Sequence, residues 1–503
     1  MTMNSPSDPA RRWPLWLDVA LALLLAAVSL GVYLGFSAAT YRLGFPLDDA
    51  WIHQTYARNL GELGEWSFVA GQPSAGSTAP LWSAWLGIGY WLGELLHISL
   101  APYFWTFLTG WLLLAGVGLA GGRFMQALLP EQVWIPRLAA ALLILEWHLV
   151  WAAGSGMETL VSALIALWVL GSLANPNPHW LRLGLVIGLN VWVRPDGLTL
   201  LGPALLVLWF VEPDLLACVR AGSRLLAGFL CTFAPYLVFN YVLAGSWWPN
   251  TFYAKQAEYA AHQTFPIWQR YLSQLGLLLV GVGVLLLPGF LGLLWQAFRP
   301  RRWPVLAAAA WFLGYLLMYA WRLPVTYQHG RYILPAMPVY FILGLAGLGI
   351  WLRIDEASAW RRVFERGWAL ATALVLAGFW LQGAQAYTRD VAVIETEMVA
   401  AAEWVNENTP PNALIAAHDI GALGYYARRP LLDLAGLVSP EVIPFIRDET
   451  RLAQYLDAQG AGYLVTFPGW YPELVAGREP LYSSRGSYSP ALGGENMNVY
   501  RWP

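Results

Sequence analysis

The sequence predicts a polytopic α-helical membrane protein of about 11–13 spans with a small C-terminal α/β domain outside the membrane. Three observations lead to this fold class. Hydrophobic residues make up 58% of the 503 residues and charged residues only 12%, against roughly 25% charge in a soluble domain. Apolar stretches of membrane-crossing length recur along most of the chain, and its character changes after Tyr387. The chain has a net charge of −2 and no basic stripe, so no nucleic-acid partner is expected.

The predicted spans follow one another closely along the chain. Most have a length close to the roughly 20 apolar residues that are needed to cross a bilayer. One of them is interrupted by Arg194-Pro195-Asp196-Gly197, and it is too long for one simple span and short for two. Such a break is tolerated where it is buried in protein or lines a watery cavity. The apolar segments lie near residues 13–39, 80–98, 102–120, 134–153, 157–174, 181–212, 225–243, 272–297, 304–320, 332–352 and 367–386.

Basic residues set the orientation, because Lys and Arg favour the cytoplasmic side of a membrane. They precede the first span and mark three later loops: Arg11, Arg12, Arg220, Arg224, Arg299, Arg301, Arg302, Arg353, Arg361, Arg362 and Arg366. The intervening loops and the chain after residue 387 are then expected outside. We therefore expect a multi-pass protein of the cell membrane with its active site facing outside.

The side on which Glu158 lies depends on the interrupted segment. Counting 181–212 as one span places Glu158 inside. Splitting it into two half-spans places Glu158 outside, provided that another apolar segment, such as 80–98, does not cross the membrane. The sequence leaves both arrangements open.

The domain boundary is predicted after residue 387. Residues 1–387 form the transmembrane domain, with a first outer loop at 40–79, and residues 388–503 form the extracytoplasmic domain. In the latter, short strand-like runs alternate with helical patterns at 395–408 and 441–458, which favours a small α/β fold. The strand-like runs are Leu414–Ala417, Pro430–Leu434, Tyr463–Phe467 and Asn498–Arg501.

Asp48 and Asp49 lie just past the first span, at the expected outer boundary of the membrane. Carboxylates so close to hydrocarbon are costly to keep and are often functional. The competing interpretation is that one of them only caps the following helix. That helix has an amphipathic pattern that fits the membrane surface, and it carries His53 one turn after Asp49.

Lys255 is the only lysine in the chain, and it lies in an outer loop with Asn250 and Tyr253. An ammonium group suits a phosphate oxygen, although an interfacial lysine can also reach water from the membrane boundary. Arg331 begins a span on the outer side, where positive charge is under-represented. An anionic ligand or a lipid headgroup would explain Arg331, and His329 lies two residues before it.

Other polar residues are candidates for contact with a substrate. Arg194 and Asp196 flank Pro195 at the helix break, where they either pair with each other or line a cavity. Glu158 lies at a span end. His418-Asp419 follows a strand-like run, at the carboxyl end where α/β folds place ligand groups; a turn with a helix cap at Asp419 is the alternative.

Together these segments resemble the GT-C class of integral-membrane glycosyltransferases, and the Asp48-Asp49 pair carries most of the likeness. The resemblance implies a polyprenyl-phosphate-linked sugar donor bound from the bilayer, transfer on the outer face, and Asp48 or Asp49 as catalytic base. The Trp-Trp-Asp-Tyr-Gly signature of oligosaccharyltransferases is absent. The branch with the cell-wall terminal arabinofuranosyltransferases is most similar in Pro73 to Trp82, Gly156 to Thr159, Arg194 to Gly197, Pro249 to Lys255 and Ile420 to Ser439.

The predicted function is inverting transfer of a single sugar from this donor to an acceptor hydroxyl on a glycan, lipid or protein. Because the leaving group is an anionic phosphate, fixed cations should stabilise it, and Lys255, Arg331 and Arg194 are the candidates. Membrane lipids are expected partners. The sequence assigns no cofactor, and a divalent cation bridging an Asp and the phosphate is an open alternative. Candidate substrate-binding residues are His53, Glu158, Asn250, Tyr253, His329, His418 and Asp419.

Two other functions compete with this prediction. A lipid or solute transporter, or a flippase, would also place charges within the membrane, but it does not need a paired acid at the outer surface. A polysaccharide ligase or polymerase would share the donor type and move whole glycans.

Overall fold

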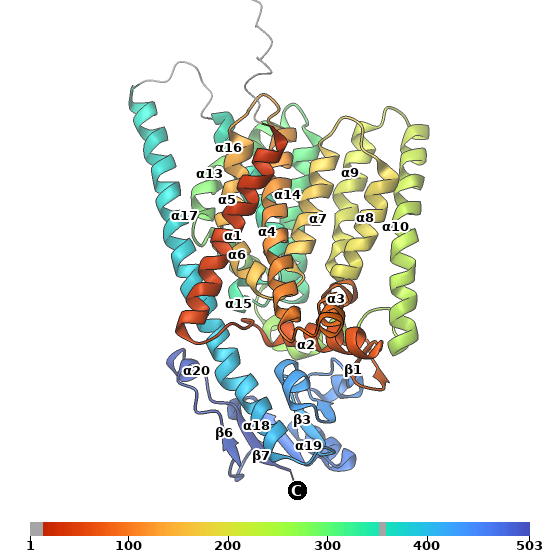
Figure 1. Ribbon diagram of the computed structural model, residues 1–503. Helices are drawn as coiled ribbons and strands as arrows, with labels where there is room; N and C mark the ends of the chain where they lie inside the picture. Colours follow the sequence, from red (N-terminus) through yellow and green to blue (C-terminus); the bar gives the residue numbers. More distant parts are fainter. Residues whose placement is uncertain (1–13, 352–358, 503) are drawn as a thin grey trace, which may run out of the picture.

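A computed structural model describes residues 14–351 and 359–502. A bundle of long helices forms one end of the molecule and a mixed α/β domain forms the other (Figure 1). Arg11, Arg12 and Arg353, which contributed to the predicted orientation, lie outside the described residues.

The bundle is that of a multi-pass membrane protein. In the described ranges, six helices are long and apolar enough to cross a membrane, or up to eight if each of two bent helix pairs is one span. Shorter apolar helices complete the bundle. In chain order its elements are α1 (Leu15–Thr40), α4 (Ala101–Leu128), α5 (Ile135–Leu145), α6 (Trp147–Gly154), α7 (Thr159–Leu173), α8 (Trp180–Val193), η3 (Pro195–Leu200), α9 (Leu201–Val211), α10 (Leu215–Ala244), α12 (Ile267–Leu279), α13 (Gly283–Phe298), α14 (Trp303–Arg322), η5 (Leu334–Ala336), α16 (Met337–Trp351) and α17 (Ala359–Ile394).

The interrupted segment at 181–212 forms two helices. Pro195 cannot donate the backbone hydrogen bond that would continue α8, and a residue before proline favours the extended conformation. Arg194 accordingly has φ −152° and ψ 133°. The η3 turn and α9 follow, and α8 and α9 stand as neighbouring rods in the bundle (Figure 1).

The segment at 80–98 forms α3 (Pro80–Leu96), which does not run along the bundle. It lies at the end facing the α/β domain, beside α2 (Asp48–Arg58) (Figure 1). Glu158 lies at this same end, because its Oε2 is 3.4 Å from Nε2 of His53 in α2. The structure therefore splits the 181–212 segment into two helices and places 80–98 at the same end of the bundle as Glu158.

Short elements connect the bundle to the α/β domain. The amphipathic pattern at 48–63 forms α2 and the π-helical turn η2 (Asn59–Leu63), but residues Ala50 to Ala57 are all buried. This helix is therefore enclosed by α3 and the α/β domain and does not lie on an open membrane surface. The other connecting elements are β1 (Ser67–Val69), β2 (Gln72–Pro73), α11 (Asn250–Glu258), η4 (Ala260–Thr264) and α15 (Tyr327–Gly330).

The α/β domain contains a five-stranded sheet of order β4-β3-β5-β7-β6. The strands β4, β3 and β5 are parallel, and β7 and β6 extend the sheet antiparallel. The predicted strands are found within about one residue of their ends, and the two-residue edge strand β6 was not predicted. The strands are β3 (Ile415–Ala417), β4 (Leu431–Asp433), β5 (Tyr463–Thr466), β6 (Tyr482–Ser483) and β7 (Asn498–Arg501).

Helix α17 joins the two parts and runs from the bundle into the α/β domain without a break (Figure 1). The predicted boundary after Tyr387 falls inside this helix. A π-helical turn then leads into the first helix of the domain. The remaining elements are η6 (Glu395–Val399), α18 (Ala400–Asn408), η7 (Leu423–Ala427), η8 (Pro440–Phe445), α19 (Glu449–Gln459), η9 (Pro468–Trp470) and α20 (Tyr488–Ala491).

Candidate active site

Asp48 and Asp49 occupy the first turn of α2. Successive residues on a helix point about 100° apart, so the two carboxylates face different surroundings. Asp48 faces the α/β domain, and Asp49 lines a cavity at the end of the bundle. The two residues that the sequence analysis treated as alternatives are therefore separated by helix geometry.

Asp48 connects α2 to the α/β domain. Its carboxylate accepts hydrogen bonds from the backbone amides of Gly421 and Ala422, each at 2.7 Å. Gly421 is required here, because a Cβ at this position would stand 2.0 Å from the Asp48 carbonyl oxygen. Burial raises the pKa of Asp48 and the two amides lower it; with the added effect of Asp49, its pKa is raised to about 6.

Asp49 bridges two cations. Lys255 Nζ lies 3.3 Å from Oδ1, and Arg331 Nη1 lies 2.6 Å from Oδ2. Burial alone would raise the pKa of Asp49, but the charges and hydrogen bonds of Arg331 and Lys255 outweigh it and hold this pKa far below the usual range. The ring of Tyr332 lies against both cations, 5.4 Å from Lys255 Nζ and 4.8 Å from Arg331 Cζ.

Local backbone structure brings the two cations to Asp49. Lys255 lies in the last turn of α11, which begins after Pro249. Arg331 follows three residues with positive φ: Gln328, His329 and Gly330. Such a conformation is costly for residues with side chains and persists only where the surroundings enforce it.

His329 is held by α17 and α6. Its Nε2 lies 2.8 Å from Asp390 Oδ2, which also accepts a hydrogen bond from Trp151 Nε1. The ring of Trp147 packs edge-on against the imidazole. His329, a candidate substrate-binding residue, is thus in contact with α17 and is not among the residues that line the cavity described below.

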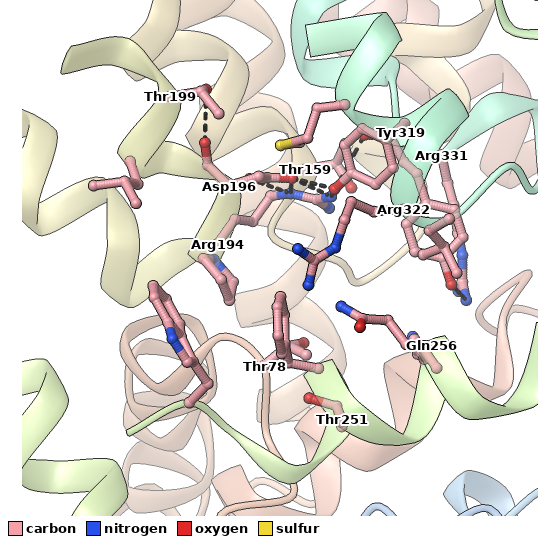
Figure 2. Close-up of a pocket in the computed structure, with 18 of the residues that line it drawn as sticks. Thr78, Thr159, Arg194, Asp196, Thr199, Thr251, Gln256, Tyr319, Arg322 and Arg331 are labelled. Atoms are coloured by element: carbon pink, nitrogen blue, oxygen red, sulfur yellow. Dashed lines mark hydrogen bonds and ion pairs between the residues drawn. The ribbon is translucent and has the colours of Figure 1, made fainter. Parts of the chain in front are cut away.

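The cavity beside Asp49 has a volume of about 560 Å³. Of the candidate residues from the sequence, it brings together Asp49, Glu158, Arg194, Lys255 and Arg331. Its walls are largely apolar and aromatic, with contributions from Trp248, Phe252, Met318 and Tyr319. Side chains from the bundle helices and from α11 face each other across it (Figure 2).

Arg322 is the cavity residue that the sequence analysis missed. It ends α14, and its guanidinium extends into the middle of the cavity (Figure 2). The Phe252 ring lies 5.2 Å from its Cζ, and no carboxylate pairs with it among the residues that the structure describes. The signal available in the sequence was the one used for Arg331, an arginine at the expected outer end of a span.

Arg194 also lines the cavity, but its charge is balanced inside the protein. Its guanidinium contacts Glu158 Oε1 at 2.9 Å, Asp196 Oδ2 at 2.9 Å and the hydroxyl of Tyr319 at 2.9 Å. Arg194 and Asp196 therefore fit both interpretations that the sequence left open: they pair with each other, and both line the cavity.

Three further candidates lie away from the cavity. His53 is 3% exposed; its Nδ1 lies 2.9 Å from Ser83 Oγ and its Nε2 faces Glu158, so it stands behind the wall. Asn250 is buried and donates to the carbonyl of Leu437 in the α/β domain. Tyr253 is exposed and packs against Phe252.

His418 and Asp419 lie at the carboxyl end of β3, as the strand pattern predicts. His418 Nε2 lies 2.9 Å from Glu258 Oε1 in α11, and its Nδ1 lies 2.7 Å from the hydroxyl of Tyr471. Asp419 Oδ2 is buried without a hydrogen-bond partner in the part of the chain that the structure describes. Burial and the nearby charge of Asp48 raise the pKa of Asp419 to about 8.

A divalent cation was an open alternative in the sequence analysis. Within residues 14–351 and 359–502, no group of three or more His, Cys, Asp or Glu side chains is arranged to hold a metal ion. Asp49 contacts two cationic side chains and Asp48 contacts two backbone amides.

Solved structures of other proteins are similar to this chain in fold. ArnT from Cupriavidus metallidurans, crystallised with undecaprenyl phosphate, matches with a TM-score of 0.59 and 17% sequence identity, over 97% of this chain and 97% of ArnT. An oligosaccharyltransferase from Archaeoglobus fulgidus matches with a TM-score of 0.61 and 13% identity, over 90% of this chain and 69% of the other. This chain has the GT-C glycosyltransferase fold.

Other comparisons add less. Mycobacterial AftD, an arabinofuranosyltransferase, matches with 17% identity over 96% of this chain and 41% of AftD, at a TM-score of 0.49 that is too low to argue from. Residues 384–500 match a family described as a domain of unknown function (DUF8728). No curated protein matches the chain significantly.

Proposed function

We propose that this protein is a membrane glycosyltransferase that moves a single sugar from a polyprenyl-phosphate-linked donor to an acceptor hydroxyl. The observation that carries the proposal is Asp49 in contact with Lys255 and Arg331 at the wall of a largely apolar cavity. ArnT, which has a similar fold, has been crystallised with undecaprenyl phosphate. A structure of the archaeal oligosaccharyltransferase AglB holds an inhibitory peptide and a dolichol-phosphate.

In this proposal the donor phosphate binds to Lys255, Arg331 and Arg322. All three line the cavity, and phosphate is a good ligand for both ammonium and guanidinium groups. The aromatic and apolar wall formed by Trp248, Phe252 and Met318 suits the first prenyl units of the carrier. Arg194 is excluded from phosphate contact because Glu158 and Asp196 already balance its charge.

Asp49 is the general base. The acceptor oxygen forms a bond to the anomeric carbon while the bond from that carbon to the phosphate oxygen breaks, and the acceptor proton passes to the Asp49 carboxylate. The polyprenyl phosphate leaves with the bonding electrons, and the three cations stabilise its added charge. A single displacement with a carboxylate as base inverts the anomeric centre, as in inverting glycosidases.

Transfer on the outer face is supported by charge asymmetry. The connections with clustered arginines, such as Arg299 to Arg302 between α13 and α14, lie at the end opposite the α/β domain (Figure 1). Positive charge favours the cytoplasmic side, which puts the cavity and the α/β domain outside. Asp48 then acts as a positioning residue, because it ties that domain to the helix that carries Asp49.

The likeness to an oligosaccharyltransferase favours one second candidate, transfer of a whole glycan. The two functions differ in the mass added to the acceptor. Single-sugar transfer adds one glycosyl residue, whereas a ligase or polymerase adds a preassembled chain.

The test is an assay of the purified full chain in lipid nanodiscs with a panel of polyprenyl-phosphate monosaccharides and membrane acceptor fractions. Wild type should add one sugar with inverted configuration. Asp49→Asn should lower the rate roughly 10²–10⁴-fold, the usual contribution of a general base. The matched control is Asp448→Asn, the same change at an exposed helix cap of α19, which should keep the wild-type rate. Full activity in Asp49→Asn, or transfer of whole glycans only, would refute the proposal.

A further inference from the structure

Asp49 contacts both Lys255 and Arg331. Each of its oxygens takes one of them, Oδ1 the ammonium of Lys255 and Oδ2 the guanidinium of Arg331. Only 25% of the Asp49 side chain and 8% of the Arg331 side chain are exposed, so solvent screens these contacts weakly. A protein binds a phosphate group in the same way, with fixed cations in contact with its anionic oxygens.

This arrangement is unsuited to proton transfer. A general base works best when its pKa lies near the working pH, but Arg331 and Lys255 hold the pKa of Asp49 far below the usual range. A resting enzyme in which Asp49 keeps both partners therefore has a base that accepts a proton poorly.

The cavity supplies a reason for the cations to leave Asp49. Arg322 extends into it without a carboxylate partner in the described ranges, and Figure 2 shows its guanidinium between the Arg194 side and the Gln256 side of the space. An entering phosphate is attracted to Arg322 first. It then competes for Lys255 and Arg331 with more acceptor oxygens than a carboxylate has.

We infer that Asp49 is an internal substitute for the donor phosphate, and that donor binding takes Lys255 and Arg331 away from Asp49 and so frees it to act on the acceptor. Base activation and donor binding are then one event, and the donor binds before the acceptor reacts. This inference rests on the proposed function, because it concerns the same cavity and the same base.

A competing anion lowers the affinity of a site for its ligand. Removing the Asp49 carboxylate should therefore raise the affinity of the cavity for a phosphate. The full chain in nanodiscs is titrated with undecaprenyl phosphate, which carries no sugar, and the dissociation constant is measured for wild type and Asp49→Asn. Removing the competing charge should tighten binding by about tenfold or more, on the scale of charge-pair couplings at buried sites. Asp49→Asn thus loses transfer and gains affinity.

The control variant is Asp419→Asn. Asp419 is a buried acid whose pKa is raised by burial and by the charges of Asp48 and Asp49, and it contacts neither Lys255 nor Arg331. Both titrations are made at about pH 9, above the raised pKa of Asp419, so that Asp419→Asn also removes a negative charge. The affinity of Asp419→Asn for undecaprenyl phosphate should then stay within about twofold of wild type, because a distant charge is screened more than a contact. If Asp419→Asn raised the affinity as much as Asp49→Asn, the loss of any nearby negative charge would have the same effect. That result would overturn the inference.

A charge-balanced pair covers the case in which Asp49→Asn does not fold, since it leaves two buried cations unpaired. Lys255→Gln is compared with Lys255→Gln combined with Asp49→Asn, and the second should again bind more tightly. Unchanged or weaker binding on loss of Asp49, in either background, overturns the inference. Failure of the proposed function is a separate result, namely a wild-type protein that transfers no sugar from any polyprenyl-phosphate donor.

Discussion

At the scale of single residues, charge balance separates the roles of the cavity arginines. Arg194 is neutralised by Glu158 and Asp196, and Arg331 is neutralised by Asp49. Arg322 packs against two aromatic rings of the cavity, with its Cζ 5.2 Å from the ring centre of Phe252 and 5.8 Å from that of Trp321. A guanidinium without a carboxylate, held beside apolar walls, retains its full capacity to bind an anion.

Arg322→Gln should therefore weaken donor binding. A hydrogen bond to a charged group contributes about 1.5–3 kcal/mol, which corresponds to roughly a 10- to 100-fold rise in the dissociation constant of undecaprenyl phosphate. Titration of the nanodisc protein measures it. Arg451→Gln, at an exposed position in α19 where the arginine stacks on Phe445, is the control. Equal affinities in wild type and Arg322→Gln would remove Arg322 from the phosphate site.

The sequence pointed to the acid pair, the single lysine and Arg331, because each is an unusual residue for its place in a membrane protein. It could not separate Asp48 from Asp49, since their difference comes from Gly421 and Ala422, more than 370 residues away. The spacing of His53 to Asp49 suggested a substrate-binding role. The burial of His53 depends on how α2 packs against its neighbours, which the local sequence does not show.

At the scale of elements, the segment α15 governs where Arg331 points. Gln328 and His329 have φ of 54° and 56°, and each such residue costs on the order of 1–3 kcal/mol. The contact of His329 with Asp390 in α17 offsets part of this strain. The position of a cavity cation therefore depends on a helix that does not itself line the cavity.

Asp390→Asn should loosen this segment and misplace Arg331. We expect the KM for the donor to rise roughly tenfold, about 1.4 kcal/mol, with a smaller change in kcat. Asp390→Glu, which keeps the charge, should recover part of the loss, and the exposed neighbour substitution Arg389→Gln should have no effect. A fall in kcat at constant KM would argue against a role in positioning Arg331.

Regular elements were predictable because their signals are local. The strands β3, β4, β5 and β7 follow from short apolar runs bounded by turn residues, and the α8–α9 break follows from Pro195. The left-handed backbone at Gln328 and His329 has no such signal. Neither residue type demands it, and the packing of His329 against Trp147 and Asp390 imposes it.

At the scale of the whole molecule, the candidate site exists only where three parts of the chain meet. Helix α2, helix α11 and the segment after the carboxyl end of β3 come together through Asp48 with Gly421 and through Glu258 with His418. Buried acids at this junction make its stability depend on pH. Asp419 is the clearest of them, because its pKa is raised to about 8.

Asp419 binds its proton more tightly in the folded state than in the unfolded chain, where its pKa is about 3.9. Stability from this group is therefore present at low pH and falls as the pH rises from about 4 to about 8. Thermal unfolding of Asp419→Asn should gain on wild type between pH 5 and pH 9, by on the order of 1–3 kcal/mol for an unpartnered buried group. A pH-independent difference between the two proteins would contradict this account.

The most direct measurement of the central claim is a density map of the full chain with undecaprenyl phosphate bound. The account predicts the phosphate in the cavity next to Asp49, with its oxygens about 2.7–2.9 Å from nitrogens of Lys255, Arg331 and Arg322, and the prenyl chain leaving along the wall formed by Trp248 and Phe252. A phosphate bound outside this cavity, with Lys255 and Arg331 not in contact with it, would contradict the account.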